Sequence, residues 1–168
     1  MQRWLVVLCV VLAGCGAAAP AVLTGPVDRA AIERELPAWR DELARAEVDE
    51  AAAQALAEVP PGAEVDVFLG TWCGDSRRLV SRLFRALERV PEGARPFAIR
   101  FVAVDRQKHD PEGLAEGRDI RFVPTIIVTR EGAEVGRIVE SAPGGVEVDL
   151  GRLLRGEAHG TLTLRADL

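Results

Sequence analysis

The residues with the clearest capacity for chemistry lie in the stretch TWCGDS, residues 71–76, whose one thiol belongs to Cys73. The pattern around it predicts a buried strand before the stretch and an amphipathic helix after it. A cysteine at such a junction lies where free backbone N–H groups and the helix dipole favour negative charge. Arg77 and Arg78 on the first turn of the helix should strengthen this effect, and Asp75 should oppose it. We therefore expect a sizeable thiolate fraction at neutral pH, and the thiolate is the nucleophile of disulfide chemistry.

The neighbours of the thiol suggest an incomplete redox site. Trp72 should cover one side of the sulfur, and Gly74 should let a substrate backbone approach closely. Ser76 stands three residues after Cys73, where a second thiol would be expected. Because a serine hydroxyl does not perform disulfide exchange, a mixed disulfide at Cys73 would need an external thiol to release it. The sequence thus predicts nucleophilic attack without internal resolution.

Alternating strands and helices must position this thiol. Strands are predicted at residues 64–69, 96–105, 123–129 and 134–140. Helices are predicted at residues 76–90, 110–120 and 146–154, the second of them short and weakened by Gly113 and Gly117. This order predicts an α/β fold with one central mixed sheet and helices on both of its faces.

Two further segments flank this core pattern. Residues 28–59 predict a helical extension of two helices, broken near Pro37 or around Val48. Trp39 within it should be a buried anchor of the core rather than a platform for a ligand. Residues 156–168 form a tail that either adds an edge strand or stays loose.

The TWCGDS motif, the helix after it and the later segment FVPTIIV together resemble the thioredoxin superfamily over roughly residues 60–155. In that family a Trp-Cys-x-x-Cys motif at a helix N-terminus faces a cis-proline loop. The resemblance implies that Cys73 is the attacking cysteine and Trp72 the tryptophan that precedes it. It also implies that Pro124 is the cis-proline and that Val123 presents its backbone to a bound peptide. The implied fold is thioredoxin-like, with a mixed sheet flanked by helices.

The resemblance assigns roles to four more residues. Ser76 takes the position of the resolving cysteine and is expected to act in catalysis by hydrogen-bonding the sulfur. Thr125, Gly74 and Asp75 are expected to line the substrate site. All four lie within the motif or directly after the implied cis-proline.

A second departure from the family pattern concerns an acid. Many thioredoxins carry a buried acid on the strand six residues before the attacking cysteine, where it serves as a base for the resolving one. Here Val67 takes that place, and Asp66 beside it should point to the opposite face because strand side chains alternate. Both departures affect the resolution half of the redox cycle.

The N-terminus resembles a bacterial lipoprotein precursor. Residues 1–14 have the layout of a signal peptide, and the sequence LAGC that ends at Cys15 resembles a lipobox. Cys15 would then carry the lipid, and residues 15–27 would form a tether. The expected location is the cell envelope, facing outside the cytoplasm, with the membrane as a partner through the lipid. Gly16 after the lipidated cysteine favours the outer membrane over the inner one in a Gram-negative host.

Composition and cysteine count limit the classes of partner and metal site that we expect for this chain. The net charge of −5 over 168 residues, with scattered basic side chains, argues against nucleic acid. Cys9 would leave with the signal peptide, so Cys73 would be the only free thiol and no zinc site built on cysteines is expected. No cofactor is expected. The expected partners are an envelope protein or small disulfide as substrate, and an external thiol that resolves the product.

Three functional hypotheses remain open from the sequence. The first is a monothiol disulfide oxidoreductase or isomerase that acts through Cys73. The second is a binding or assembly module of thioredoxin-like shape in which Cys73 is a relic. The third is a thiol that reduces peroxide, since exposed thiolates are readily oxidised.

Overall fold

The computed structural model describes residues 22–168. The predicted signal peptide, Cys15 and most of the expected tether lie outside the described residues. Within residues 22–168, no helix is both long and apolar enough to cross a membrane.

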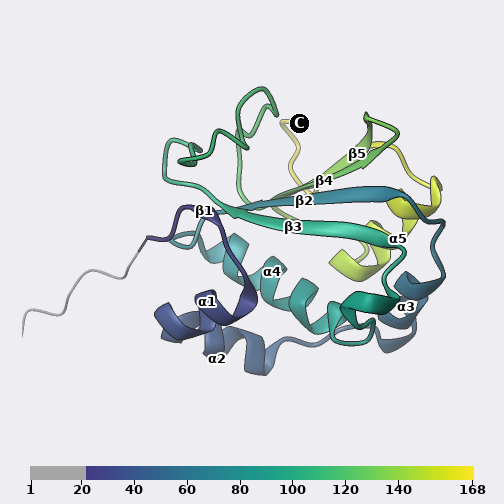
Figure 1. Cartoon of the computed structure of the whole chain (residues 1–168), viewed down its shortest axis with the longest axis horizontal. Coiled ribbons are helices and arrows are strands. Elements are labelled where there is room, and N and C mark those ends of the chain that lie inside the picture. Colours follow the sequence, from purple (N-terminus) through teal and green to yellow (C-terminus); the bar gives the residue numbers. More distant parts are fainter. Residues whose placement is uncertain (1–21) are drawn as a thin grey trace, which may run out of the picture.

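A six-stranded mixed sheet, in the order β1-β3-β2-β4-β5-β6, forms the centre of the molecule (Figure 1). Its strands are β1 (Gly25–Pro26), β2 (Ala63–Leu69), β3 (Phe97–Ala103), β4 (Thr125–Arg130), β5 (Ala133–Val139) and β6 (Gly160–Leu162). The described helices are α1 (Arg29–Glu35), α2 (Pro37–Arg45), α3 (Glu50–Ala55), α4 (Gly74–Leu87) and α5 (Val146–Arg155). Strand β2 runs parallel to β3 and antiparallel to β4. The predicted α/β class with a mixed sheet flanked by helices is confirmed.

Strand β2 is buried on both faces of the sheet, as its hydrophobic sequence predicts. Val65, Val67 and Leu69 face the larger core, and Phe68 faces the smaller one. Asp66 shares the face of Phe68 and lies within ion-pair distance of two arginines in that region. The expectation that Val67 and Asp66 point to opposite faces is therefore confirmed.

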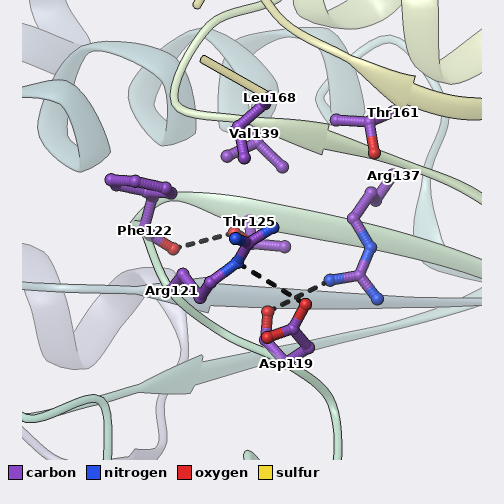
Figure 2. A pocket seen from close by; sticks show the side chains of 8 residues that line it. All are labelled: Asp119, Arg121, Phe122, Thr125, Arg137, Val139, Thr161 and Leu168. Carbon is purple, nitrogen blue, oxygen red and sulfur yellow. Dashed lines mark hydrogen bonds and ion pairs between the residues drawn. The ribbon is translucent and has the colours of Figure 1, made fainter.

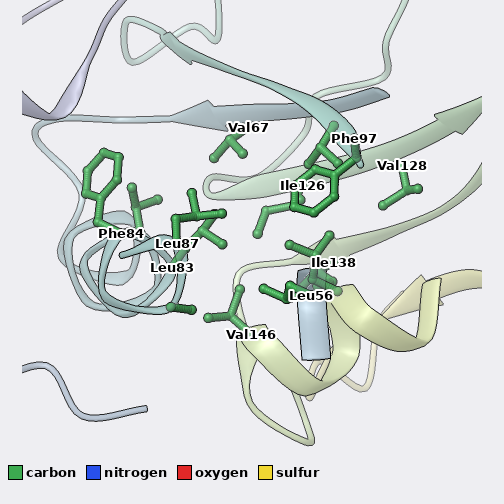
Figure 3. Close-up of a cluster of buried hydrophobic side chains, with 14 of the residues drawn as sticks. Leu56, Val67, Leu83, Phe84, Leu87, Phe97, Ile126, Val128, Ile138 and Val146 are labelled. Atoms are coloured by element: carbon green, nitrogen blue, oxygen red, sulfur yellow. The ribbon is translucent and has the colours of Figure 1, made fainter. Parts of the chain in front are cut away.

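All five described α-helices cover the same face of the sheet (Figure 1). Together they bury the larger cluster, which we call the helix-side core. Figure 3 shows part of it, where α4 and α5 meet the sheet. The labelled side chains include Val67, Leu83, Leu87, Ile126, Ile138 and Val146.

The prediction of helices on both faces is wrong, because residues 110–120 form turns rather than a helix. Gly113 and Gly117 have positive φ angles of 70°, which end any regular helical turn. The Asp110 carboxylate accepts hydrogen bonds from the backbone N–H groups of Leu114 and Ala115, at 3.1 and 2.8 Å. Burial alone would raise the pKa of Asp110, but these backbone hydrogen bonds outweigh it and hold the pKa below its usual value.

This long loop covers the second face of the sheet in place of a helix. Ala115 is buried there against Phe68, Val102 and Ile127, and Trp72 packs at the same cluster. We call this cluster the loop-side core.

The N-terminal extension contains three α-helices rather than the predicted two, because both expected breaks occur. Helix α1 ends before Pro37, and α3 begins after Asp49, whose side chain accepts a hydrogen bond from Ala52 N. Trp39 is 3% exposed, which confirms it as an anchor of the core. Residues 25–27, expected at the end of a tether, instead pair with β3.

The C-terminal tail contributes the edge strand β6, which pairs in parallel with β5. Of the two outcomes that the sequence left open for the tail, the structure thus shows the edge strand. The tail also returns toward the loop-side face, where Arg165 stacks on Phe122 with its guanidinium carbon 3.9 Å from the ring centroid.

A buried carboxylate joins the extension to the rest of the fold. Glu147, at the start of α5, is fully buried and accepts hydrogen bonds from Arg82 Nε at 2.9 Å and Asp49 N at 2.8 Å. Burial alone would raise the pKa of Glu147, but these hydrogen bonds and the charge of Arg82 outweigh it and lower the pKa. The ionised form therefore stabilises the fold above the unfolded-state pKa, and that contribution is lost as the pH falls through the folded-state pKa.

Replacement of Glu147 by Gln should lower the free energy of unfolding by about 2 kcal/mol near neutral pH, less than for a fully buried pair because Arg82 remains partly hydrated. Urea unfolding at a series of pH values measures this. The difference from the unaltered protein should shrink as the solution becomes acidic. Glu157→Gln is the matched control, because Glu157 pairs with Arg155 at the surface. An equal effect of the two substitutions, or a difference that does not change with pH, would contradict the assignment.

Candidate functional site

The thiol lies at the junction between the central strand and the first long helix. Strand β2 ends at Leu69, and Cys73 is the N-cap residue of α4, with an extended backbone at φ −96° and ψ 128°. Its side chain is half-buried, and its sulfur packs against the loop-side core. This is the strand-to-helix position that the sequence predicted.

The fold brings the loop of residues 122–125 to the thiol. The Val123–Pro124 peptide bond is cis. Cys73 Sγ donates a hydrogen bond to the carbonyl oxygen of Val123 at 3.3 Å, across fifty positions of sequence. Cys73, Val123 and Pro124, which the sequence predicted to act together, therefore lie next to one another.

Thr125, expected to line the substrate site, is buried at the start of β4. Its hydroxyl donates a hydrogen bond to the carbonyl oxygen of Phe122 at 2.8 Å. This contact closes the loop around Pro124, so Thr125 holds the loop rather than offering a free group to a ligand.

Ser76 does not make the expected hydrogen bond to the sulfur. Its side chain is fully buried, and its hydroxyl oxygen accepts a hydrogen bond from the backbone N–H of Gly70 at 3.0 Å. Gly70 directly follows the last residue of β2, so this bond closes the connection between β2 and α4. Ser76 therefore stabilises the loop that presents Cys73.

Trp72 is held in one orientation by contacts on several sides. Its indole Nε1 donates a hydrogen bond to the carbonyl oxygen of Val104 at 3.1 Å. The Arg106 guanidinium lies over the ring, 4.8 Å from the centroid. A Cβ atom at Gly70 would lie 2.8 Å from the ring, so only glycine fits there. No pattern in the sequence marks this close approach, so the need for glycine at this position could not be predicted.

The charges near the thiol are partly paired with each other. Arg78 forms an ion pair with Asp75, and both side chains are exposed. Arg77 faces Glu42 of α2, with Arg77 Nε 3.7 Å from the nearest carboxylate oxygen. The positive charge near the thiol is thus lower than the sequence suggested, because each arginine faces a carboxylate. Gly74 is exposed beside the thiol.

The extension touches the motif directly through Thr71. Trp39 Nε1 donates a hydrogen bond to the carbonyl oxygen of Thr71 at 3.1 Å. The Thr71 hydroxyl accepts another from Leu23 N at 3.0 Å. No motif in the sequence indicates this role of Thr71, because both of its partners lie far away in the chain.

A small hollow of about 90 Å³ lies on the flank of the cis-proline loop (Figure 2). Arg137 donates a hydrogen bond to the carbonyl oxygen of Asp119, and the Asp119 carboxylate lies 3.6 Å from Arg121. Leu168 from the C-terminal tail closes one side of the hollow. None of the residues that line the hollow is a cysteine, so it adds no second sulfur to the site. Residues 22–168 contain no cluster of three or more histidine, cysteine or acidic side chains that could hold a metal ion.

Comparison with known proteins gives a consistent result. Residues 46–147 match the model of the family described as Thioredoxin. A thioredoxin-like protein of Acanthamoeba polyphaga mimivirus is 25% identical over 93 residues, which are 55% of this chain and 64% of that protein. The matched region thus spans less than two thirds of this viral relative. A solved structure of a protein of unknown function from Pseudomonas aeruginosa has a TM-score of 0.55 at 18% identity, covering 79% of this chain and 92% of that one, and supports the fold alone.

The structural role of Ser76 can be tested with a neighbour on the same helix. Ser76→Ala leaves the buried N–H of Gly70 without a partner and should lower the free energy of unfolding by about 1–2 kcal/mol. Ser81 is the matched control, since it is equally buried on α4 and its hydroxyl has no hydrogen-bond partner among the described residues. Ser81→Ala should therefore change stability by less than about 0.5 kcal/mol or increase it. Similar losses in both variants by chemical denaturation would show that the Ser76 hydroxyl has no special role.

Proposed function

Because the chain belongs to the thioredoxin family, we propose that it performs monothiol thiol–disulfide exchange or disulfide isomerisation, with Cys73 as the nucleophile. The observation that carries this proposal is the contact of Cys73 Sγ with Val123 O at the N-terminus of α4. It places the one described thiol beside the backbone of the cis-proline loop, where an extended peptide can be held. Ser76 supports that geometry without supplying a second sulfur.

The chemistry needs one attacking thiolate and one external thiol. The Cys73 thiol loses its proton to solvent, and the thiolate attacks one sulfur of a substrate disulfide. The substrate S–S bond breaks as the mixed disulfide forms, and the departing sulfur takes up a proton. A second thiol then attacks the mixed disulfide and regenerates Cys73. When that thiol is another cysteine of the substrate, the net result is isomerisation without oxidation or reduction.

A binding module is the second candidate. Cys73 is the one free cysteine among residues 22–168, so the described residues cannot complete a dithiol cycle by themselves. In this alternative the cis-proline loop and its surroundings hold a partner, and the thiol makes no exchange. Reactivity of Cys73 toward a disulfide separates the two candidates.

The monothiol mechanism predicts a mixed disulfide that persists. We use the full chain in detergent with Cys9→Ser and Cys15→Ser, so that Cys73 is the only thiol. It is reacted with one equivalent of dithiobis(nitrobenzoate), a disulfide of two nitrothiobenzoate groups. One equivalent of nitrothiobenzoate should appear, and the second should appear only after an external thiol is added, because no internal thiol can release it. When Ser76→Cys is added, the new thiol should release the second equivalent spontaneously. When Cys73→Ser is made without Ser76→Cys, no thiol remains and no nitrothiobenzoate should appear. Spontaneous release of the second equivalent without Ser76→Cys, or an unreactive Cys73, would contradict the mechanism.

We also propose that the protein is anchored to the cell envelope through Cys15. This rests on the LAGC sequence and the apolar run before it. On expression in a bacterium, the protein should incorporate radiolabelled palmitate and partition into a detergent phase. Cys15→Ser should abolish both, because no thioether can form, whereas Cys9→Ser should change neither. Labelling that survives Cys15→Ser would contradict the proposed anchor.

A further inference from the structure

A cavity of about 400 Å³ lies between the N-terminal extension and the tryptophan of the motif. The extension supplies its apolar wall, residues 36–39, in which Leu36 and Trp39 are buried core residues. Trp72 forms the facing wall, and Arg77 and Arg106 line the cavity as well. Its volume falls in the range of ligand pockets, roughly 300–1,000 Å³.

The cavity is lined by residues on both sides of Cys73 in the sequence, Trp72 and Arg77. Trp72 both lines the cavity and packs with Cys73 in the loop-side core. Arg77 is one helical turn after Cys73, and its backbone N–H donates to the carbonyl oxygen of Cys73 at 3.1 Å. A polypeptide whose cysteine reaches Cys73 therefore has neighbouring side chains within reach of the cavity.

The cavity combines apolar walls with two arginines, and neither of them has a hydrogen-bonded carboxylate partner among the described residues. Arg77 Nε is buried without a hydrogen-bond partner, and the nearest oxygen of Glu42, at 3.7 Å, is beyond hydrogen-bond distance. Among residues 22–168, no carboxylate lies within ion-pair distance of Arg106, which stacks on Trp72 instead. Glu35 is the one acidic residue that lines the cavity, and it pairs with Arg34. The lining is therefore complementary to an apolar group with an adjacent negative charge.

The extension is hydrogen-bonded to the motif that forms the other part of the cavity lining. The hydrogen bonds of Trp39 and Leu23 to Thr71 attach both the helix and the N-terminal segment to the loop that carries Trp72. The cavity walls therefore keep a defined position relative to the thiol.

We propose that the cavity is a substrate-selection site, which binds an apolar side chain and a neighbouring carboxylate of a polypeptide while its cysteine exchanges with Cys73. This inference rests on the exchange function proposed above. It gives the extension a specific role, which is to select acidic-apolar sequences beside the reactive cysteine. The preference arises because the apolar group leaves water and the carboxylate satisfies the arginines.

Eight short peptides, which carry four residue combinations in two orders, test the preference. Each has one cysteine capped as a nitrothiobenzoate disulfide, with leucine or glycine and with glutamate or glutamine beside it, in both orders along the chain. The protein is the full chain in detergent, carrying Cys9→Ser and Cys15→Ser. The rate constant of exchange is measured for each peptide and, separately, for dithiodipyridine, a small neutral disulfide that has neither a leucine side chain nor a carboxylate. In at least one order, the leucine–glutamate peptide should react about tenfold faster than the glycine–glutamine peptide.

Two variants connect the preference to the cavity. Ala38 is exposed and lines the apolar wall, so Ala38→Leu should fill the space and reduce the leucine preference to about twofold or less. Ala51→Leu is the matched control, because Ala51 is equally exposed on α3 and does not line the cavity. Arg106→Gln should remove much of the glutamate preference while the leucine preference remains. High salt should also reduce the glutamate preference, because it screens the charges.

The outcomes separate this inference from the function on which it rests. If dithiodipyridine and all peptides fail to react with Cys73, both proposals are wrong. If dithiodipyridine reacts but all eight peptides react equally, exchange stands and the selection site is overturned. Equal loss of the preference in Ala38→Leu and Ala51→Leu would also overturn it, because the effect would then not depend on the cavity.

Discussion

A buried hydrogen bond from Gly70 N to the Ser76 hydroxyl closes the loop between β2 and α4. Buried backbone groups must find partners, and a loop between a strand and a helix has few available within its own backbone. With this bond made, the chain turns from the central strand directly into α4 and leaves Cys73 at the helix N-terminus. The positions of Trp72 and of the cis-proline contact follow from that turn.

The same bond explains what a serine contributes at this position. A thioredoxin-like site needs a sulfur at Cys73 for attack and a second sulfur at residue 76 only for internal resolution. The side chain of Ser76 keeps the loop geometry and provides no second sulfur. Val67 in place of an acid fits this picture, because there is no resolving cysteine here for a base to deprotonate. The proposed chemistry and the structural role of Ser76 are thus two consequences of one substitution.

Much of the fold was predictable because it follows from local patterns. The hydrophobic run of β2 and the amphipathic face of α4 are unambiguous, and they placed Cys73 and its flanking elements correctly. The cis-proline at Pro124 came from the resemblance, since no physical pattern in the sequence indicates it. The helix predicted at residues 110–120 is wrong, because the Asp110 carboxylate accepts hydrogen bonds from backbone N–H groups that a helix would use. The partner of Ser76 and the links through Thr71 were out of reach, since they depend on which groups the fold brings together.

The N-terminal extension packs against the helices beside the motif and is hydrogen-bonded to the motif itself. Its helices pack on α4 and α5, and its hydrogen bonds to Thr71 connect it to the motif. The motif is therefore held by the extension through Thr71, and its thiol contacts the cis-proline loop. This arrangement keeps the attacking sulfur accessible while restricting what can approach it.

The proposed exchange requires that the fold make Cys73 a nucleophile. The most direct measurement compares its rate of alkylation by iodoacetamide at neutral pH in the folded protein and in urea, with Cys9 and Cys15 replaced by serine. If the helix N-terminus activates the thiol, the folded protein reacts faster, by about tenfold. A folded protein that reacts at the rate of the unfolded chain, or more slowly, would contradict the claim and favour a thioredoxin-like binding module.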